Sequence, residues 1–373
     1  FNLSVSGSDA FMAAVSANDA WQLVHVKQPH PAAFPDAFQR EDGQWVYKTV
    51  PARELWETIL RTTYEFAEPG FIFMDRVNQE NNLWYVEYIV ASNPCAEQVL
   101  PPYGCCDLGS INLTQFVRNP FTTHAYFDLE SFASTAQDAV RFLDNVLDVT
   151  AWPLEQQRQE AMNKRRIGVG YLGLGSAKMI LGIRYGSAES IALTERIGMA
   201  MMVATYRASI ELAKERGAFP LFDAEKYLAG GFAKRLPEDI REDIRVHGIR
   251  NSHLMSIAPT GTMSLAWANN ASNGIEPAFM LSYQRRIRQP DDSFRVEDVE
   301  DYAYLLYKAM GGDTSALPEA FVTTKDLSVD DHLKVMATAQ RFIDASISKT
   351  VNCPAEMSFE DFGDVYMLSL IHI

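Results

Sequence analysis

A thiol, a carboxylate and an amide occur at alternate positions in the segment Asn93-Pro94-Cys95-Ala96-Glu97. Because side chains in an extended or loop segment alternate with a period of two, we expect Asn93, Cys95 and Glu97 to project to the same side. The thiol can do radical or nucleophilic work, the carboxylate can move a hydroxyl proton, and the amide can orient that hydroxyl. The set suits chemistry on a sugar; the alternative is a chance triplet on a solvated loop.

Two adjacent cysteines, Cys105 and Cys106, follow this segment. A vicinal pair can act as a redox couple, although adjacent cysteines form a disulfide only with strained geometry. Zinc is not expected, because the C-x₂-C spacing and matching histidines are absent. Four cysteines in 373 residues make no disulfide scaffold, so we expect a reducing, cytoplasmic compartment. For the fourth, Cys353, the pattern predicts only a small buried residue.

A second polar segment, Ala258-Pro259-Thr260-Gly261-Thr262, follows a short apolar run. Its free backbone N–H groups, flexible glycine and two hydroxyls can form a nest that binds phosphate without a formal positive charge. The alternative is an ordinary turn, which can contain the same residue types. A further polar turn of this kind covers Ala271–Pro277.

The run Gly168-Val169-Gly170-Tyr171-Leu172-Gly173 matches the dinucleotide fingerprint G-x-G-x-x-G. That fingerprint must follow a strand and open a helix, with an acidic residue about 20 positions later. Met162–Arg166 before it does not make a buried strand. We therefore reject dinucleotide binding and expect the small residues to let a helix and a strand pack closely.

The elements that position these motifs alternate between helices and short apolar runs. Helical spacing of apolar residues predicts helices at four places, namely Ala52–Phe66, Phe132–Leu147, Ile191–Arg216 and Val329–Asp344. We expect Asp326-Leu327-Ser328 to form the N-cap region of the last of them. The second helix should bury one face, made of Ala139, Val140, Phe142, Leu143 and Val146. We expect a short buried strand over Phe71–Met74, a strand within Ser252–Leu265, and a surface excursion over Arg288–Asp301. The alternation favours an α/β architecture with a largely parallel sheet, either open or closed into a barrel.

Composition limits the classes of partner. Of the 373 residues, 33 are basic and 48 acidic, which gives a net charge of -15. This balance opposes binding to nucleic acid or an anionic membrane through a general basic face. No stretch approaches the ~20 apolar residues of a membrane span. The beginning has no positively charged signal region, and Tyr366–Ile373 ends without a cap, so we expect both termini to be truncations.

Together, five motifs resemble the large (catalytic) subunit of ribonucleotide reductase. They are Asn93-Pro94-Cys95-Ala96-Glu97, Cys106-Asp107-Leu108-Gly109-Ser110-Ile111-Asn112-Leu113, Arg165-Arg166-Ile167-Gly168-Val169-Gly170, Ala258-Pro259-Thr260-Gly261-Thr262 and Asn273-Gly274-Ile275-Glu276-Pro277. Weaker similarity at Phe1–Val5 and Ile347–Asn352 extends the match almost end to end. The resemblance implies that residues 1–373 are part of one catalytic domain, the ten-stranded α/β barrel of the ribonucleotide reductase and glycyl-radical type. Cys95 would lie at the tip of its central loop.

By resemblance, Cys95 is the radical cysteine that removes the 3′ hydrogen of the ribose, Glu97 is the base for the 3′ hydroxyl, and Asn93 hydrogen-bonds the sugar hydroxyls. Cys106 resembles one member of the dithiol that reduces the 2′ carbon and is itself re-reduced by an external dithiol such as thioredoxin. The phosphates of the substrate would be bound by Ala258, Pro259, Thr260, Gly261 and Thr262. The implied reaction converts ribonucleotides, as diphosphates, to deoxyribonucleotides, and a homodimer is compatible with it.

Two departures from the family pattern matter. The other reducing cysteine of the family lies upstream of the radical cysteine, so we expect this chain to lack half of the dithiol, together with the effector region and the C-terminal end. Cys105 is an extra thiol, because its neighbour Cys106 already fits the pattern in register.

The N-P-C-x-E form, the eleven-residue spacing from Cys95 to Cys106 and the Pro-Thr-Gly-Thr turn most resemble the adenosylcobalamin-dependent class II. In that class, homolysis of the cofactor makes the thiyl radical directly. One alternative is a class I large subunit, which needs a separate metal-radical small subunit. Others are a glycyl-radical enzyme of related shape and an inactive fragment that serves only as a nucleotide-binding barrel. We expect no metal site in the chain itself.

Overall fold

The structure, a computed structural model, describes residues 3–372, which divide into two compact units. The first unit comprises residues 3–78 and 356–371, and the second comprises residues 79–355. Phe1 and Asn2, where the weak family-like segment at the beginning starts, lie outside the described residues, as does Ile373 at the other end.

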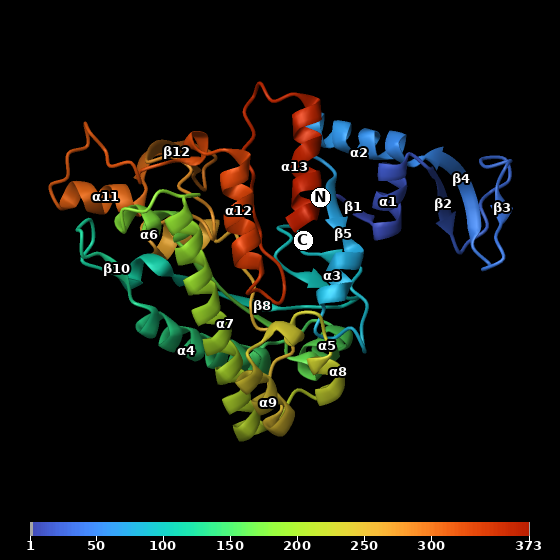
Figure 1. The fold of residues 1–373 in the computed structure, drawn as a ribbon, viewed down its shortest axis with the longest axis horizontal. Helices are drawn as coiled ribbons and strands as arrows, with labels where there is room; N and C mark the ends of the chain where they lie inside the picture. Colours follow the sequence, from blue (N-terminus) through green and yellow to red (C-terminus); the bar gives the residue numbers. More distant parts are fainter. Residues whose placement is uncertain (1–2, 373) are drawn as a thin grey trace. The chain divides into compact units, whose positions relative to one another are not determined.

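The first unit combines small sheets with helices (Figure 1). Its elements are β1 (Ser4–Gly7), α1 (Asp9–Ala17), β2 (Ala20–His25), β3 (Phe38–Gln39), β4 (Trp45–Pro51), α2 (Ala52–Phe66), β5 (Gly70–Phe73), the start of α3 (Met74–Glu80) and α13 (Phe359–His372). β1 pairs with β5 in parallel, whereas β2, β4 and β3 form an antiparallel sheet. The predicted helix Ala52–Phe66 is confirmed with the same bounds, and the strand predicted over Phe71–Met74 is β5, half-buried and followed at Met74 by α3.

The second unit holds the remaining elements. They are β6 (Ala91–Ser92), β7 (Val99–Leu100), β8 (Asp107–Asn112), β9 (Val117–Arg118), β10 (Tyr126–Phe127), α4 (Leu129–Val149), α5 (Glu155–Lys164), β11 (Ile167–Leu172), α6 (Leu174–Ile180), α7 (Ala188–Arg216), α8 (Ala224–Leu228), α9 (Glu238–His247), α10 (Gly261–Trp267), β12 (Ser282–Arg288), β13 (Phe294–Glu300), α11 (Tyr302–Ala309) and α12 (Val329–Gln340). Short 3₁₀ turns cover Leu113–Phe116, Ala233–Arg235 and Thr324–Asp326.

Parallel pairing forms the centre of the second unit. β8 and β11 pair in parallel over their full lengths. Parallel bridges then join Val169 of β11 to Met255, and Ile257 to Ile347. Four chain segments therefore run parallel, as the alternating pattern predicts, whereas β6–β7, β9–β10 and β12–β13 are antiparallel. Among the described residues the hydrogen-bonded sheets are open, and none closes into a barrel.

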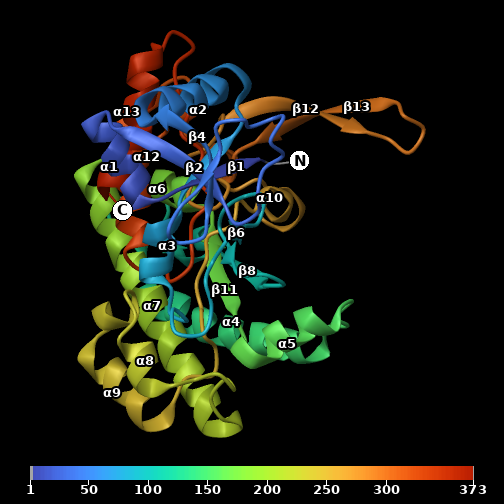
Figure 2. The ribbon, with the colours of Figure 1, turned by 90° about the vertical axis from the view of Figure 1, so that its right-hand side faces the viewer.

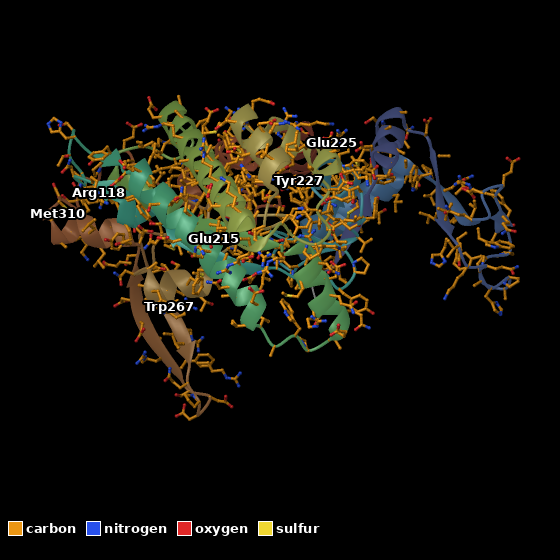
Figure 3. All side chains as sticks on the ribbon, turned by 90° about the horizontal axis from the view of Figure 1, so that it is seen from below. Arg118, Glu215, Glu225, Tyr227, Trp267 and Met310 are labelled. Carbon is orange, nitrogen blue, oxygen red and sulfur yellow. The ribbon has the colours of Figure 1, made fainter. Side chains whose placement is uncertain are left out.

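The helices that cover this centre largely follow the sequence pattern. α4 and α7 pack side by side (Figure 1), and α7 is the longest helix of the described residues. On their outer surface, Glu215 of α7 pairs with Arg141 of α4 (Figure 3 labels Glu215). The prediction that Phe142 is on the buried face of α4 was wrong, because its side chain is 66% exposed; the buried stripe instead runs along Phe132, Ala136, Val140, Leu143 and Leu147.

The predicted cap before the last helix of this unit is confirmed. Ser328 precedes α12 and its Oγ accepts the Asp331 N–H (3.2 Å), while the Asp331 carboxylate accepts the Ser328 N–H (3.0 Å). This reciprocal capping box satisfies two N–H groups at the start of the helix. The helix ends at Gln340, four residues earlier than predicted.

The rejected glycine motif lies inside a strand. Gly168–Leu172 belongs to the fully buried β11, which follows helix α5. A Cβ atom on Gly170 would lie 2.1 Å from the Ser256 carbonyl oxygen, and one on Gly168 would lie 2.4 Å from the Leu108 side chain. The small residues therefore allow neighbouring strands to approach each other, rather than a helix and a strand as the sequence pattern predicts.

The polar excursion predicted over Arg288–Asp301 covers the tip and the second strand of an antiparallel hairpin, β12–β13, which projects from its unit (Figure 2). Trp267, at the end of α10, is 79% exposed (Figure 3). Within residues 3–372, no helix is long and apolar enough to cross a membrane. No group of three or more His, Cys, Asp or Glu side chains in the same range is placed to hold a metal ion.

Candidate active site

Asn93–Gln98 forms a compact turn between β6 and β7. The Asn93 N–H donates to the Gln98 carbonyl (2.9 Å), and the Ala96 N–H donates to the Asn93 carbonyl (3.1 Å). Asn93 Oδ1 accepts the Gln98 N–H (3.1 Å), so this side-chain oxygen closes the turn. Ala96 has a positive φ of 63°, a conformation that a tight turn imposes at some cost in strain.

The turn gives its two reactive groups different environments. Cys95 is exposed, whereas Glu97 is only 3% exposed and its Oε2 has no hydrogen-bond partner within the described residues. Partial burial and then the nearby charge of Glu97 raise the pKa of the Cys95 thiol. The thiol is therefore held protonated and reachable, next to a buried carboxylate.

Contacts with the parallel strands fix the turn. Ser256 Oγ donates to the Glu97 carbonyl (2.8 Å). Gly168 of β11 packs against the turn. A Cβ atom on this residue would come within 2.9 Å of Gln98 Nε2 and 3.0 Å of Ser256 Cβ. The glycine that resembled a nucleotide fingerprint therefore makes room for the candidate catalytic turn.

Cys105 and Cys106 precede β8 directly and are both half-buried. The Cys106 thiol donates to the Asp107 carbonyl (3.4 Å), and the Cys105 thiol to the Gln157 carbonyl (3.7 Å). Burial raises the pKa of both thiols, that of Cys106 most strongly. Cys353 is exposed, so the prediction that it is a small buried residue was wrong.

A buried ionic cluster lies next to these thiols. Glu87 pairs with Arg166 and with Lys164 (2.8 Å to the latter). Burial alone would raise the pKa of Glu87, but the two cations outweigh it and hold that pKa below its usual value. The cations also lower the pKa of Cys105, which limits the rise that burial causes.

Several buried polar atoms close to the candidate thiols make no hydrogen bond. Within residues 3–372, twelve buried side-chain nitrogen or oxygen atoms form no hydrogen bond, although one of them, in Glu87, belongs to the ion pair with Lys164. Five of them belong to three residues in the turn and at the start of β8, namely Glu97, Gln98 and Asp107. Buried polar groups are normally satisfied, so the unpartnered atoms of Glu97 and Gln98, both in the turn that carries Cys95, indicate groups that can meet a substrate.

The proposed phosphate segment forms a second turn. Thr260 has a positive φ of 57° and precedes α10, and its Oγ1 accepts the Gly274 N–H (2.9 Å). This bond joins Ala258–Thr262 to Ala271–Pro277. A Cβ atom on Gly274 would lie 2.5 Å from the Ala258 carbonyl oxygen, so a glycine is required there. The sequence predicts both turns but not their contact.

A cavity of about 260 Å³ opens beside these turns. Its lining consists of Asn270, Ala271, Ser272, Asn273, Glu276, Pro277, Phe279, Met280, Tyr283, Asp301, Thr324, Thr350 and Asn352. Burial raises the pKa of Asp301 to about 6, although Ser176 donates to this carboxylate (2.8 Å). The lining combines polar side chains with two aromatic rings, which suits a hydrogen-bonding organic ligand.

The sequence analysis did not predict the polar contacts that hold the wall of this cavity in place. Glu276 accepts from Lys349 Nζ and from the Thr350 N–H (2.6 Å), and Lys349 also contacts His332 Nδ1 (2.8 Å). Burial and then the Lys349 charge lower the pKa of His332 to about 4. The only sequence signal for Lys349 is the weak family-like segment Ile347–Asn352, which predicts no chemistry by itself.

Comparison with known proteins gives a consistent result. The family model "Ribonucleotide reductase, barrel domain" matches residues 1–370. The "Vitamin B12-dependent ribonucleoside-diphosphate reductase" of Mycobacterium tuberculosis (strain CDC 1551 / Oshkosh) is 32% identical over 386 residues, covering 98% of this chain and 50% of the relative. The protein of the same name from Thermoplasma acidophilum is 29% identical, covering 99% and 45%.

A relative with a different name also matches. The "Ribonucleoside-diphosphate reductase subunit alpha" of Synechocystis is 34% identical over 247 residues, covering 61% of this chain and 30% of the relative. The chain therefore spans about half the length, or less, of the curated relatives that it matches.

Proposed function

Because this chain belongs to the ribonucleotide reductase barrel-domain family, we propose that it is part of a catalytic subunit that reduces ribonucleoside diphosphates to deoxyribonucleotides. The observation that carries the proposal is the turn Asn93–Gln98, where an exposed thiol stands beside a buried carboxylate oxygen without a partner. The reaction is a thiyl-radical reduction that serves DNA synthesis.

In this proposal Cys95 takes the 3′ hydrogen atom of the ribose. Glu97 accepts the proton of the 3′ hydroxyl through Oε2, which no other described group occupies. Asn93 uses its oxygen to close the turn, so its amide N–H groups are the ones that meet the sugar hydroxyls. A tight turn fixed to β11 keeps these three groups in one place.

Cys106 supplies one reducing equivalent at the 2′ carbon, and a thioredoxin-like dithiol restores it. This chain covers 50% of the M. tuberculosis relative, and we propose that the second thiol of the pair comes from outside the matched length. Ala258, Pro259, Thr260, Gly261 and Thr262 bind the substrate phosphates through backbone N–H groups and hydroxyls. Support comes from the left-handed Thr260 and the open space beside Gly261.

The fold proposed for the whole protein is the ten-stranded α/β barrel of this family, with residues 1–373 forming part of one catalytic domain. The four parallel segments at the centre of the second unit support this, because parallel neighbours are what such a barrel contains. Cys95 would then occupy the tip of the central loop.

The proposed radical source is adenosylcobalamin, which when bound supplies the radical that oxidises the thiol of Cys95. The names of the relatives from M. tuberculosis and T. acidophilum support this choice. The residues of this chain suit that cofactor, because the Cys95 thiol is exposed and held protonated. A thiol in that state can give up a hydrogen atom. The Synechocystis relative, named as a subunit alpha, favours the alternative of a separate radical subunit.

We further propose a homodimer in the cytoplasm, where cysteines remain reduced.

The decisive test uses the complete protein that carries this chain. Ribonucleoside diphosphate reduction is assayed with a dithiol reductant, with and without adenosylcobalamin, for the wild type, Cys95→Ser and Cys353→Ser. We expect cobalamin-dependent activity that Cys95→Ser abolishes and Cys353→Ser, a matched change at another exposed thiol, leaves intact. Activity that needs a metal-radical subunit would keep the family reaction and replace the cofactor. Activity that survives in Cys95→Ser would refute the proposal.

A further inference from the structure

Charged side chains are scarce around the candidate phosphate segment. Between Arg250 and Arg285 the sequence contains no Lys or Arg, and Glu276 is its only acidic residue. A phosphate bound by Ala258–Thr262 would therefore be repelled by the one charge of this stretch, unless another part of the chain neutralises it.

Contacts between the two polar turns bring Glu276 close to that segment. The Gly274 N–H donates to Thr260 Oγ1 (2.9 Å), and a Cβ atom on Gly274 would lie 2.5 Å from the Ala258 carbonyl oxygen. The Glu276 N–H donates to the Asn273 carbonyl (2.7 Å), which folds the second turn tightly. Since only two residues separate Gly274 from Glu276, the carboxylate lies roughly 8–10 Å from the first turn.

Lys349 reaches Glu276 from the neighbouring parallel segment. Ile347 forms a parallel bridge with Ile257, and the Ser348 N–H donates to the Ile257 carbonyl (2.9 Å). The two segments then leave the sheet side by side. One continues as the candidate phosphate segment, and the other continues as Lys349.

The ammonium group of Lys349 has three acceptors. Its Nζ donates to the Glu276 carboxylate, to His332 Nδ1 (2.8 Å) and to the Thr350 carbonyl. Glu276 also accepts the Thr350 N–H (2.6 Å). The Lys349 side chain is only 2% exposed. An ammonium group has three donors, so all of them are engaged in this cluster.

The charge balance of this cluster depends on a single cation. Within residues 3–372, Glu276 has no second ion-pair partner, and Lys349 is the only Lys or Arg after Arg341. Burial and then the Lys349 charge lower the pKa of His332 to about 4, so its ring is neutral near pH 7 and adds no charge. Without Lys349, the carboxylate would stand unneutralised beside the two turns.

We propose that Lys349 is a positioning residue of the phosphate site: by neutralising Glu276, it allows the turn Ala258–Thr262 to bind an anion without a cation of its own. This role rests on the proposed function, which assigns the substrate phosphates to that turn. Lys349 acts through Glu276 and does not touch the phosphates, because its donors are already engaged. The carboxylate serves the geometry, since it joins Lys349 and the Thr350 N–H to the second turn.

The test measures anion binding by the complete protein that carries this chain, without cobalamin or reductant. Inorganic pyrophosphate is the probe, and isothermal titration calorimetry gives its Kd in about 10 mM salt, where the Debye length is about 30 Å. The wild type is compared with Lys349→Met, Lys349→Arg and the double variant Lys349→Met/Glu276→Gln. Lys334→Met is the matched control, because it removes an exposed lysine that pairs with Asp330 and changes the net charge equally.

The expected effects follow from the charge balance. Lys349→Met should weaken pyrophosphate binding about four- to sixfold, the effect of a unit charge roughly 8–10 Å from a doubly charged anion even at the dielectric constant of water. Lys349→Arg and the double variant restore neutrality and should stay within about twofold of the wild type, as should Lys334→Met. The loss in Lys349→Met should shrink in 1 M salt, where the Debye length is about 3 Å.

Equal Kd values for the wild type and Lys349→Met would overturn the proposal, because the charge of Glu276 would then not reach the anion. A loss that the double variant does not recover, or that persists in 1 M salt, would also overturn it and leave Lys349 a structural role. If Lys349→Met does not fold, the double variant and Lys349→Arg decide the matter, since weak binding by either contradicts the proposal.

The failure of the proposed function has separate signatures. A wild type that binds no pyrophosphate would refute the phosphate assignment and this inference together. Activity that survives in Cys95→Ser would refute the radical assignment alone and leave the role of Lys349 unchanged.

Discussion

Two groups of buried polar side chains in the second unit differ in how they are satisfied. Around Arg165, each charge has a partner: the guanidinium donates to Asp144 Oδ1 and Asp148 Oδ1 at 2.7 Å each and to the Asp144 carbonyl at 2.8 Å. Asn251 closes the network by donating to Asp144 and to the Arg165 carbonyl, both at 3.0 Å. In the candidate active site, Glu97, Gln98 and Asp107 leave five side-chain atoms without partners.

The difference separates structure from chemistry. A closed polar network holds its elements in register, and here it joins α4, the residue after α5 and the strand segment near Asn251. An open set of polar groups stabilises the fold less and stays available to a substrate. The two arginines of the Arg165-Arg166 motif therefore have supporting roles, whereas Glu97, in the turn that carries Cys95, is available for chemistry.

The largest expected effect on folding is at the closed network. Arg165→Met should lower the free energy of unfolding by about 3–5 kcal/mol, because it leaves the buried Asp144 carboxylate with weaker partners. Chemical denaturation monitored by circular dichroism measures it. Arg158→Met removes an exposed guanidinium that pairs with Glu155 and should leave the midpoint unchanged. Equal unfolding midpoints for Arg165→Met and Arg158→Met would mean that water reaches the Arg165 network and solvates its charges.

The next effect is at the junction of the two polar turns. Thr260→Ala should cost about 1–2 kcal/mol, because the buried Gly274 N–H loses its acceptor. Thr260→Ser keeps the hydroxyl and relieves a branched side chain at positive φ, so it should match or exceed the wild type. If alanine and serine have the same unfolding free energy, the bond between the turns contributes nothing to the fold.

The sequence predicted the elements better than their contacts. The helix Ala52–Phe66 and the cap at Ser328 follow from local rules of spacing and capping, which need no tertiary information. Phe142 was misplaced because helical spacing allows more than one stripe, and the packing partner decides which is buried. Two glycines of β11 matched a nucleotide fingerprint by their letters, although their function depends on Ser256 and Leu108, which are distant in sequence.

The candidate site shows the same limit. Asn93, Cys95 and Glu97 were found from their types and spacing, yet a period of two does not predict that the thiol is exposed and the carboxylate buried. The left-handed Ala96 and the bond from Ser256 produce that difference. The unpartnered carboxylate of Asp107 was not predicted either, because nothing local reveals that a carboxylate will be buried without a hydrogen-bond partner.

A pH-dependent effect on stability is expected at Asp107. Its folded pKa of about 6 lies above the usual value, so its contribution is fully present below pH 4 and is lost as the pH rises through 6. Asp107→Asn should therefore equal the wild type near pH 4 and be more stable by about 1 kcal/mol at pH 8, a figure reduced because the group is partly exposed. Denaturation curves at both pH values test this. A variant less stable at pH 8 would indicate a hidden partner for the carboxylate.

The smallest expected effect on stability comes from the same substitution made at two buried glutamates. Glu97→Gln should change the free energy of unfolding by no more than about 0.5 kcal/mol, because its Oε2 has no partner to lose. Glu87→Gln, with an equally buried side chain, breaks its pairs with Arg166 and Lys164 and should cost several kcal/mol. Parallel denaturation curves measure the two changes.

Turnover should respond to Glu97→Gln although stability does not. If the proposed function holds, this variant of the complete protein that carries the chain should lower kcat by about 10²–10⁴-fold, since an amide cannot accept the hydroxyl proton. A folded and stable protein that has lost turnover is the result that distinguishes a group kept free for chemistry from one kept paired for the fold. If Glu97→Gln instead destabilised the protein as much as Glu87→Gln, the unpartnered oxygen would be structural, and the contrast between the two groups would not hold.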